Sequence, residues 1–223
     1  MPAPGSMMHL LRLTSPSLPV GAFSYSRGLE SAVQHGWVKD EETARAWILG
    51  VLEHSFAAFD GAVLLRMMIA LAAGDIGAFR RLDAWLASGR ESRELQLEDR
   101  RMGTALLRLL IDLDVTRAKD CSDEQLGYTA AFALAAEHWA LPAGEALRGL
   151  MWSVVESQVA ASIRLVPLGQ TAGQRILIAA DEVIERAAVH AESLPDDEIG
   201  NASIGMAMAS AWHETQYSRL FRS

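Results

Sequence analysis

The 223-residue sequence is long enough for one large domain with an extensive hydrophobic core. Half of the residues are hydrophobic and the mean hydropathy is +0.12, so either the core is large and helical or some apolar surface serves partner proteins. The net charge of −8 disfavours nucleic acid as the main ligand, because a phosphate backbone requires a basic surface.

The single cysteine, Cys121, provides no disulfide framework and fits a reducing cytosol. We expect a structural or merely tolerated thiol, because no catalytic partner lies near it in sequence. No basic region followed by an apolar run is present at the start, so we expect no secretion signal. The uncharged stretches are also shorter than the ~18–20 residues that a membrane span needs. These features predict a cytoplasmic protein without a membrane-spanning helix.

The first thirty residues depart from a regular pattern. We expect residues 1–8 to be disordered or carried over from a cloning vector, because a short proline-containing stretch precedes the second methionine, Met7. Residues 14–30 contain two prolines and two glycines, which impose an irregular path. Serines and aromatic residues alternate through them. A strap that caps helices over the core would explain much of this mixture, which a plain loop does not need.

The periodicity of the remaining chain is helical almost throughout. Apolar residues at three- and four-residue steps predict a helix with the stripe Ile48, Val51, Leu52, Phe56, Phe59 and Val63. Gly74 followed by Asp75 predicts a helix end and a new N-cap. The stripe that follows is Ile76, Phe79, Leu82 and Leu86. Residues 90–101 are dense in charges of both signs, which favours a solvated helix face with ion pairs.

The second half continues in the same way. Ser122, with Gln125 three residues later, predicts a capping box before an alanine-rich helix. Pro142 suits the first turn of the next helix, and Pro167 ends it. Two more helices are predicted, over about residues 170–191 and 204–215. We find no alternating strands with hairpin signals, no repeat and no linker, so residues 1–223 form a single all-α domain of roughly eight to ten helices with an irregular N-terminal segment.

The usual catalytic and metal-binding motifs are missing. The six histidines are scattered, no two are four residues apart, and no Cys–His spacing typical of zinc occurs. Neither the phosphate-binding pattern GxxxxGK[ST] nor the nucleophile pattern GxSxG is present. We therefore expect no catalytic residues, no tightly bound cofactor and no metal site. A binding protein is favoured over an enzyme.

The last residues, 216–223, combine aromatic and apolar side chains with arginines, the residue types that anchor protein–protein interfaces. They include Tyr217, Arg219, Leu220, Phe221 and Arg222. One interpretation is a last turn that folds back on its own core. The other is a tail that inserts into a partner protein.

Three segments together resemble the UreF-type urease accessory proteins. LTSPSLPVGAFSYSRGLESAVQHGWV (residues 13–38) is similar to the family's N-terminal signature, and IRLVPLGQ (163–170) to its central signature. GNASIGMAMASAWHETQYSRLFRS (200–223) is similar to its C-terminus. The resemblance covers roughly residues 10–223. One difference is that a lysine occupies the position of Arg164 in some relatives, and the two cations differ in geometry.

The resemblance implies an all-α, homodimeric and non-enzymatic urease maturation factor. Such proteins bind UreD (also called UreH). The pair recruits the nickel-carrying GTPase UreG and docks on apo-urease, to which Ni²⁺ is delivered in a GTP-dependent way. The family's C-terminus is understood to insert into UreD, which supports the second interpretation of residues 216–223.

Candidate partner contacts are the polar residues inside these signatures, namely Glu30, Arg164, His213 and Arg219, together with Tyr217, Leu220, Phe221 and Arg222. Each polar residue could equally serve a structural hydrogen bond or ion pair. Asp60 is a weaker candidate. Two alternatives remain: a GTPase-activating regulator of UreG that acts through an arginine such as Arg27 or Arg164, and a self-contained helical enzyme.

Overall fold

The computed structural model describes residues 5–223 and shows an all-α domain, as the periodicity predicts. No strand occurs among these residues. The π-helical segment η2 joins α3 and α4 into one 32-residue helix, so ten separate α-helices are present in the described part. The elements are α1 (Ser6–Leu13), η1 (Ala22–Ser24), α2 (Leu29–Gln34), α3 (Glu41–Val51), η2 (Leu52–Gly61), α4 (Ala62–Ala72), α5 (Ile76–Ser88), α6 (Arg93–Asp112), α7 (Thr116–Asp120), α8 (Tyr128–His138), α9 (Ala143–Leu165), α10 (Gln170–Ser193), η3 (Asp196–Glu198) and α11 (Ile204–His213).

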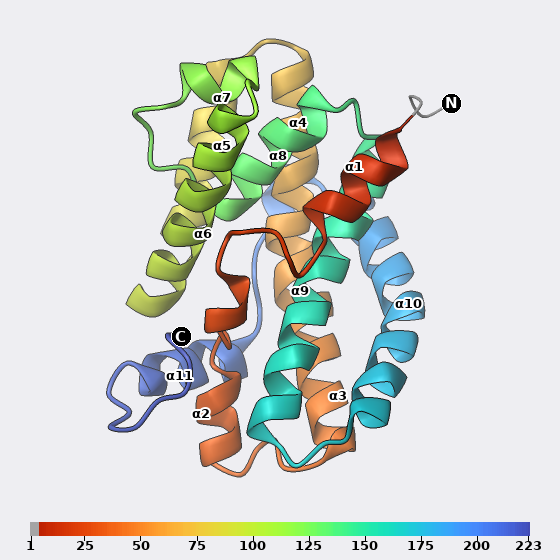
Figure 1. The fold of residues 1–223 in the computed structure, drawn as a ribbon, viewed down its shortest axis with the longest axis vertical. Helices are drawn as coiled ribbons and strands as arrows, with labels where there is room; N and C mark the ends of the chain where they lie inside the picture. The colour runs from red at the N-terminus through yellow and green to blue at the C-terminus, as the bar shows by residue number, and fades with distance from the viewer. Residues whose placement is uncertain (1–4) are drawn as a thin grey trace.

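The long helix formed by α3, η2 and α4 runs through the middle of the domain (Figure 1). Helices α9 and α10 pack against α3 and η2, whereas α5 and α8 pack against α4, and α6 lies on α8. By length and composition the long helix could span a membrane, but 78% of its most apolar window is buried inside the domain. It therefore serves as the central core helix.

Two of the predicted helix boundaries follow from local chemistry and are confirmed. Gly74 has a φ of +71° just after α4, and the side chain of Asp75 accepts a 2.8 Å hydrogen bond from the backbone N–H of Ala78 at the start of α5. Helix α9 ends at Leu165, two residues before Pro167, because proline cannot continue the hydrogen-bonding pattern.

The predicted capping box at Ser122 is wrong. Helix α8 begins only at Tyr128, and its first N–H groups are satisfied by carboxylates from other helices. The backbone N–H of Gly127 donates to Asp83 over 2.8 Å, and that of Tyr128 donates to Asp99 over 3.0 Å. Because these two acceptors come from α5 and α6, the start of α8 is set by tertiary contacts rather than by the local sequence.

The N-terminal segment begins with a helix and continues as a strap. Residues 6–8 lie in α1, although disorder is expected for residues 1–8; residues 1–4 lie outside the described part. After α1 the chain crosses over α9 (Figure 1), and Leu13, Val20 and Tyr25 are buried there. This arrangement fits the strap interpretation of residues 14–30.

Candidate partner-binding site

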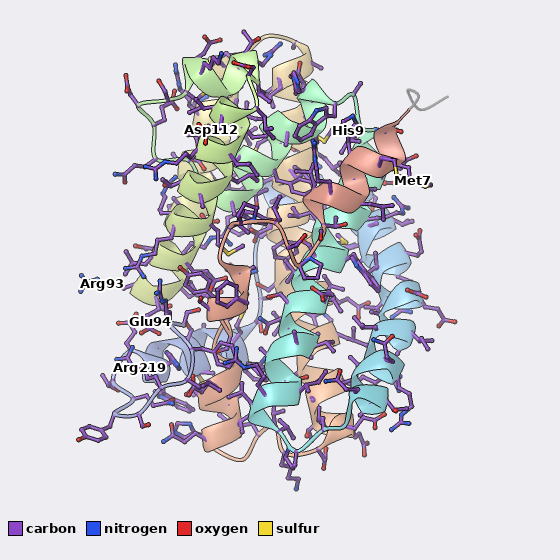
Figure 2. All side chains as sticks on the ribbon, in the orientation of Figure 1. Met7, His9, Arg93, Glu94, Asp112 and Arg219 are labelled. Atoms are coloured by element: carbon purple, nitrogen blue, oxygen red, sulfur yellow. The ribbon has the colours of Figure 1, made fainter. Side chains whose placement is uncertain are left out.

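The C-terminal segment starts with α11, which packs closely on α2. Gly28 precedes α2 with a φ of +80°, and a Cβ at this position would lie 3.0 Å from the backbone nitrogen of Ser210. A glycine is therefore required for the two helices to approach. After His213 the chain turns back, and Figure 2 shows Arg219 close to Glu94 in the first turn of α6.

Glu30, in the first turn of α2, holds the returning chain. Its Oε1 accepts a 2.7 Å hydrogen bond from the backbone N–H of Leu220, and its Oε2 accepts one of 2.8 Å from Phe221. The carboxylate is largely buried, and hydrogen bonds from N–H groups to an ionised acceptor are stronger than neutral ones. One side chain of the N-terminal segment thus fixes two consecutive residues of the tail.

His213 connects this anchor to α6. Its ring is fully buried, with Nδ1 2.6 Å from Glu94 and Nε2 3.3 Å from Glu30. Glu94 also receives a hydrogen bond from the guanidinium of Arg219. The histidine is therefore a bridge between two carboxylates inside the protein.

The last residue is buried as well. The main-chain oxygen of Ser223 accepts a 2.8 Å hydrogen bond from the backbone N–H of Ser26 and a second one from the Ser26 hydroxyl. The Ser223 hydroxyl donates to Glu98 over 2.6 Å. Burial raises the pKa of Glu98, although Arg27, 3.4 Å away, and the bond from Ser223 oppose this shift. The tail is thus held at Leu220 and Phe221 and again at its last residue.

Phe221 supplies the apolar part of this docking. It is 4% exposed and belongs to the hydrophobic core, and the guanidinium of Arg164 lies 4.7 Å above the centre of its ring. Such a cation–π contact adds to the burial of the ring. The exposed Arg164 therefore covers the docked tail from the end of α9.

A different set of side chains remains in solvent. Tyr217 is fully exposed and Leu220 is 55% exposed. On α11 the apolar side chains Ile204, Met208 and Trp212 recur every four residues and are 75%, 42% and 36% exposed. The ring of Trp212 lies 5.1 Å from that of Trp37, which is also exposed. We call Ile204, Met208, Trp212 and Trp37 the α11 surface.

Asp60 lies elsewhere, inside the core. Its carboxylate accepts hydrogen bonds from Arg90 over 2.6 and 2.9 Å and from the hydroxyl of Thr129. Burial alone would raise the pKa of Asp60, but the charge and hydrogen bonds of Arg90 outweigh it, and the pKa is lowered. This position points to a structural ion pair rather than to a contact with a partner.

Within residues 5–223, no group of three or more histidine, cysteine, aspartate or glutamate side chains is arranged to hold a metal ion.

The comparisons with known proteins are decisive for the family. The UreF family model matches residues 38–181, which is more than half of the chain. The chain belongs to the UreF family of urease accessory proteins.

Curated relatives support this over nearly the whole length. The sequence is 62% identical to "Urease accessory protein UreF 2" of Brucella anthropi, over 97% of this chain and 96% of the relative. It is 45% identical to "Urease accessory protein UreF" of Alkalilimnicola ehrlichii, over 96% of this chain and 94% of the relative. A relative of the same name from Chromohalobacter salexigens is 42% identical, over 99% of this chain and 96% of the relative. A role in urease maturation follows from this membership, and the names are those of an accessory protein rather than of an enzyme.

The structure brings together most of the candidate site residues, in the arrangement of a tail that folds back on its own core. Glu30, His213 and Phe221 are buried and hold the tail on its own chain. The same network contains Arg164, Arg219 and the backbone of Leu220. Tyr217 projects fully into solvent, and only the backbone N–H of Arg222 is bonded, to Ser24. Whether any of them touches a partner stays a prediction.

Sequence reasoning missed three members of the network: Glu94, Glu98 and Ser26. The two glutamates lie in the charge-dense stretch 90–101, whose composition predicts a solvated face, but both side chains point inward. Their spacing of four residues, on the same side of α6 as buried Leu95 and Met102, is the signal that could have found them. Ser26 lies in the N-terminal signature but was not singled out.

Proposed function

We propose that this protein is a non-catalytic scaffold for urease maturation. Together with UreD it recruits the GTPase UreG and supports GTP-dependent delivery of nickel, the cargo, to apo-urease. It acts in the cytoplasm as a homodimer and holds no nickel tightly itself. Family membership supports the role in urease maturation. The exposed apolar residues of the α11 surface support the role as a scaffold that binds partner proteins.

The α11 surface has the composition of a docking site. Soluble proteins rarely leave several large apolar side chains in solvent next to one another, and such patches commonly mark interaction sites. Tryptophan and methionine are enriched at interfaces, and two tryptophans occur here. Ile204 and Met208 add little to the core, since their side chains are 75% and 42% exposed. A partner that covers this surface would remove them from water.

The docked tail extends the same surface. Tyr217 and Leu220 are exposed beside α11 and can contact UreD while the tail stays in place. Insertion of Phe221 into UreD would instead require the tail to leave the Glu30 anchor. We therefore expect first contact through α11, Tyr217 and Leu220, with the docked tail as the platform.

The test is a charge placed on the α11 surface. The double variant Ile204→Arg, Met208→Arg should fold normally, because both side chains are exposed, but should fail to co-purify with UreD and fail to support urease activation in cells. The matched control is the double variant Ile178→Arg, Val189→Arg on α10, where the side chains are 70% and 57% exposed. Unchanged capture of UreD by the Ile204→Arg, Met208→Arg variant, with normal circular dichroism, would refute the assignment of this surface.

The arginine-based alternative, in which the protein activates UreG, makes different demands on Arg27 and Arg164. The side chain of Arg27 is only 16% exposed and lies beside Glu98 and the ring of Phe56, so it is held inside. Arg164 is exposed but covers Phe221. GTP turnover by the assembled complex with Arg164→Ala separates this alternative from a pure scaffold, when the amides of Leu220 and Phe221 keep their protection in that variant.

A further inference from the structure

Helix α6 separates its charges by sign. The carboxylates of Glu94, Glu98 and Asp99 face inward, with side-chain exposures of 11%, 6% and 8%, and each is paired with an arginine. Arg93 and Arg101 face outward from the same stretch. Within α6, these three carboxylates therefore lie on a buried face, whereas Arg93 and Arg101 lie on an exposed one.

The exposed face forms a stripe along the helix. Arg93, Leu97, Arg101 and Arg108 are all exposed and follow one another at steps of four, four and seven residues, which keeps them on one side. The stripe is roughly 22 Å long, because fifteen steps of about 1.5 Å separate Arg93 from Arg108. Figure 2 labels Arg93 at one end of α6 and Asp112 near the other. We call these four residues the α6 stripe.

The guanidinium groups of the α6 stripe have no carboxylate partner. Among residues 5–223, no carboxylate oxygen lies within 4.0 Å of the side-chain nitrogens of Arg93, Arg101 or Arg108. Asp112 is exposed one turn beyond Arg108 and is not within this distance. By contrast, Arg100 turns from the same helix to a 2.8 Å pair with Asp83. In a chain of net charge −8, an unpaired cationic line is a distinct local feature.

From this arrangement we infer that the α6 stripe is a docking surface for an acidic segment of a partner protein. Arginine binds carboxylates in a bidentate way and is weakly hydrated, so it suits such contacts. Leu97, 39% exposed between Arg93 and Arg101, offers one apolar contact in the middle. The strong negative charge of the rest of the molecule repels an acidic partner elsewhere and directs it to this line.

The α6 stripe is separate from the α11 surface. It shares no residue with that surface, and its charge is basic rather than apolar. Arg101 and the tail residue Arg222 do line one cleft, so an acidic segment could extend from α6 toward the tail. The inference does not depend on the proposed role in urease maturation, because it concerns the chemistry of this face alone.

The experiment measures binding of a fluorescein-labelled, glutamate-rich peptide with one central leucine by fluorescence anisotropy, at low and high salt. The test variant is Arg93→Gln, Arg101→Gln, Arg108→Gln. The matched control is Lys39→Gln, Arg45→Gln, Arg81→Gln, three exposed cations on other helices and loops that also lack a carboxylate within 4.0 Å. Both triple variants change the net charge equally, and circular dichroism checks that both are folded.

We expect the test variant to bind the peptide about tenfold more weakly at low salt, and to lose most of the salt dependence, while the control binds like the wild type. Equal weakening in both variants would show a general charge effect and overturn the inference. Absence of peptide binding by the wild type would overturn it too. Tighter binding of a single-stranded RNA of the same length would assign the stripe to nucleic acid instead.

Discussion

The tail should be released when Glu30 is removed, and the size of the effect can be worked out from the structure. In Glu30→Ala, the backbone N–H groups of Leu220 and Phe221 lose hydrogen bonds of 2.7 and 2.8 Å to a carboxylate. Hydrogen bonds to charged groups contribute about 1.5 kcal/mol or more each, so docking of the tail should weaken by about 3 kcal/mol. This corresponds to an equilibrium shift of roughly 100-fold toward the undocked tail.

Hydrogen exchange of individual amides is the appropriate assay, because local opening and global unfolding then appear separately. In Glu30→Ala we expect the amides of Leu220 and Phe221 to exchange about 100-fold faster, while core amides of α8 keep their rates. Glu30→Gln should lie between, near tenfold, because its side-chain oxygen can still accept one of the two bonds. Glu182→Ala, an exposed glutamate on α10, is the matched control.

Trypsin gives an independent check, since Arg219 and Arg222 are cleavage sites inside the tail. Faster cleavage there is expected for Glu30→Ala and not for Glu182→Ala. The reasoning is refuted if Leu220 and Phe221 stay as protected as in the wild type. It is also refuted if tail and core amides accelerate together, because Glu30 would then stabilise the whole fold rather than the docked tail.

Three further predictions concern the core. Asp60→Asn should destabilise the fold by about 3–5 kcal/mol at pH 7, because Arg90 loses its main partner. The pKa of Asp60 in the folded protein is lowered from 3.8, so the ionised carboxylate stabilises the fold above that pH. Urea titrations should therefore show the difference in unfolding free energy between wild type and variant shrinking as the pH falls below 3.8. Gly103→Ala would place its methyl group onto the carbonyl oxygen of Leu126, before α8, and thermal unfolding should show a loss of about 3 kcal/mol or more in stability. Gly50→Ala meets nothing within 4 Å and should instead stabilise α3 by about 0.5–1 kcal/mol. Burial raises the pKa of Cys121 to about 11, so iodoacetamide should label it far more slowly in the folded protein than in urea at pH 8.

Periodicity and helix punctuation predict most of the fold, because these features act over one or two turns. The boundary at Gly74 and the break before Pro167 are examples. The start of α8 could not be predicted, since its caps are carboxylates of Asp83 and Asp99 on other helices. The π-helical register of η2 was missed for a related reason: apolar residues three and four apart fit an α-helix equally well.

The site shows the same limit more sharply. Composition indicates that residues 216–223 bind something, and it cannot tell whether the receiving surface is another protein or the same chain. Here the deciding partner, Glu30, is 190 residues away from Leu220 in sequence. The buried glutamates of α6 were missed because a charged stretch was treated as uniformly solvated, although the side on which a charge lies is set by helix phase.

The three segments that carry the family resemblance are one unit in space. Ser26 and Glu30 come from the first, Arg164 from the second, and His213 and Phe221 from the third. The first four hold the tail, and Phe221 is the side chain by which the tail docks. A substitution in any of them can therefore weaken partner binding by releasing the tail, without touching the partner. Loss of UreD capture assigns a direct contact only when tail protection is unchanged in the same variant. By this criterion the exposed Tyr217 and the α11 surface can be tested directly, whereas Glu30 and His213 cannot.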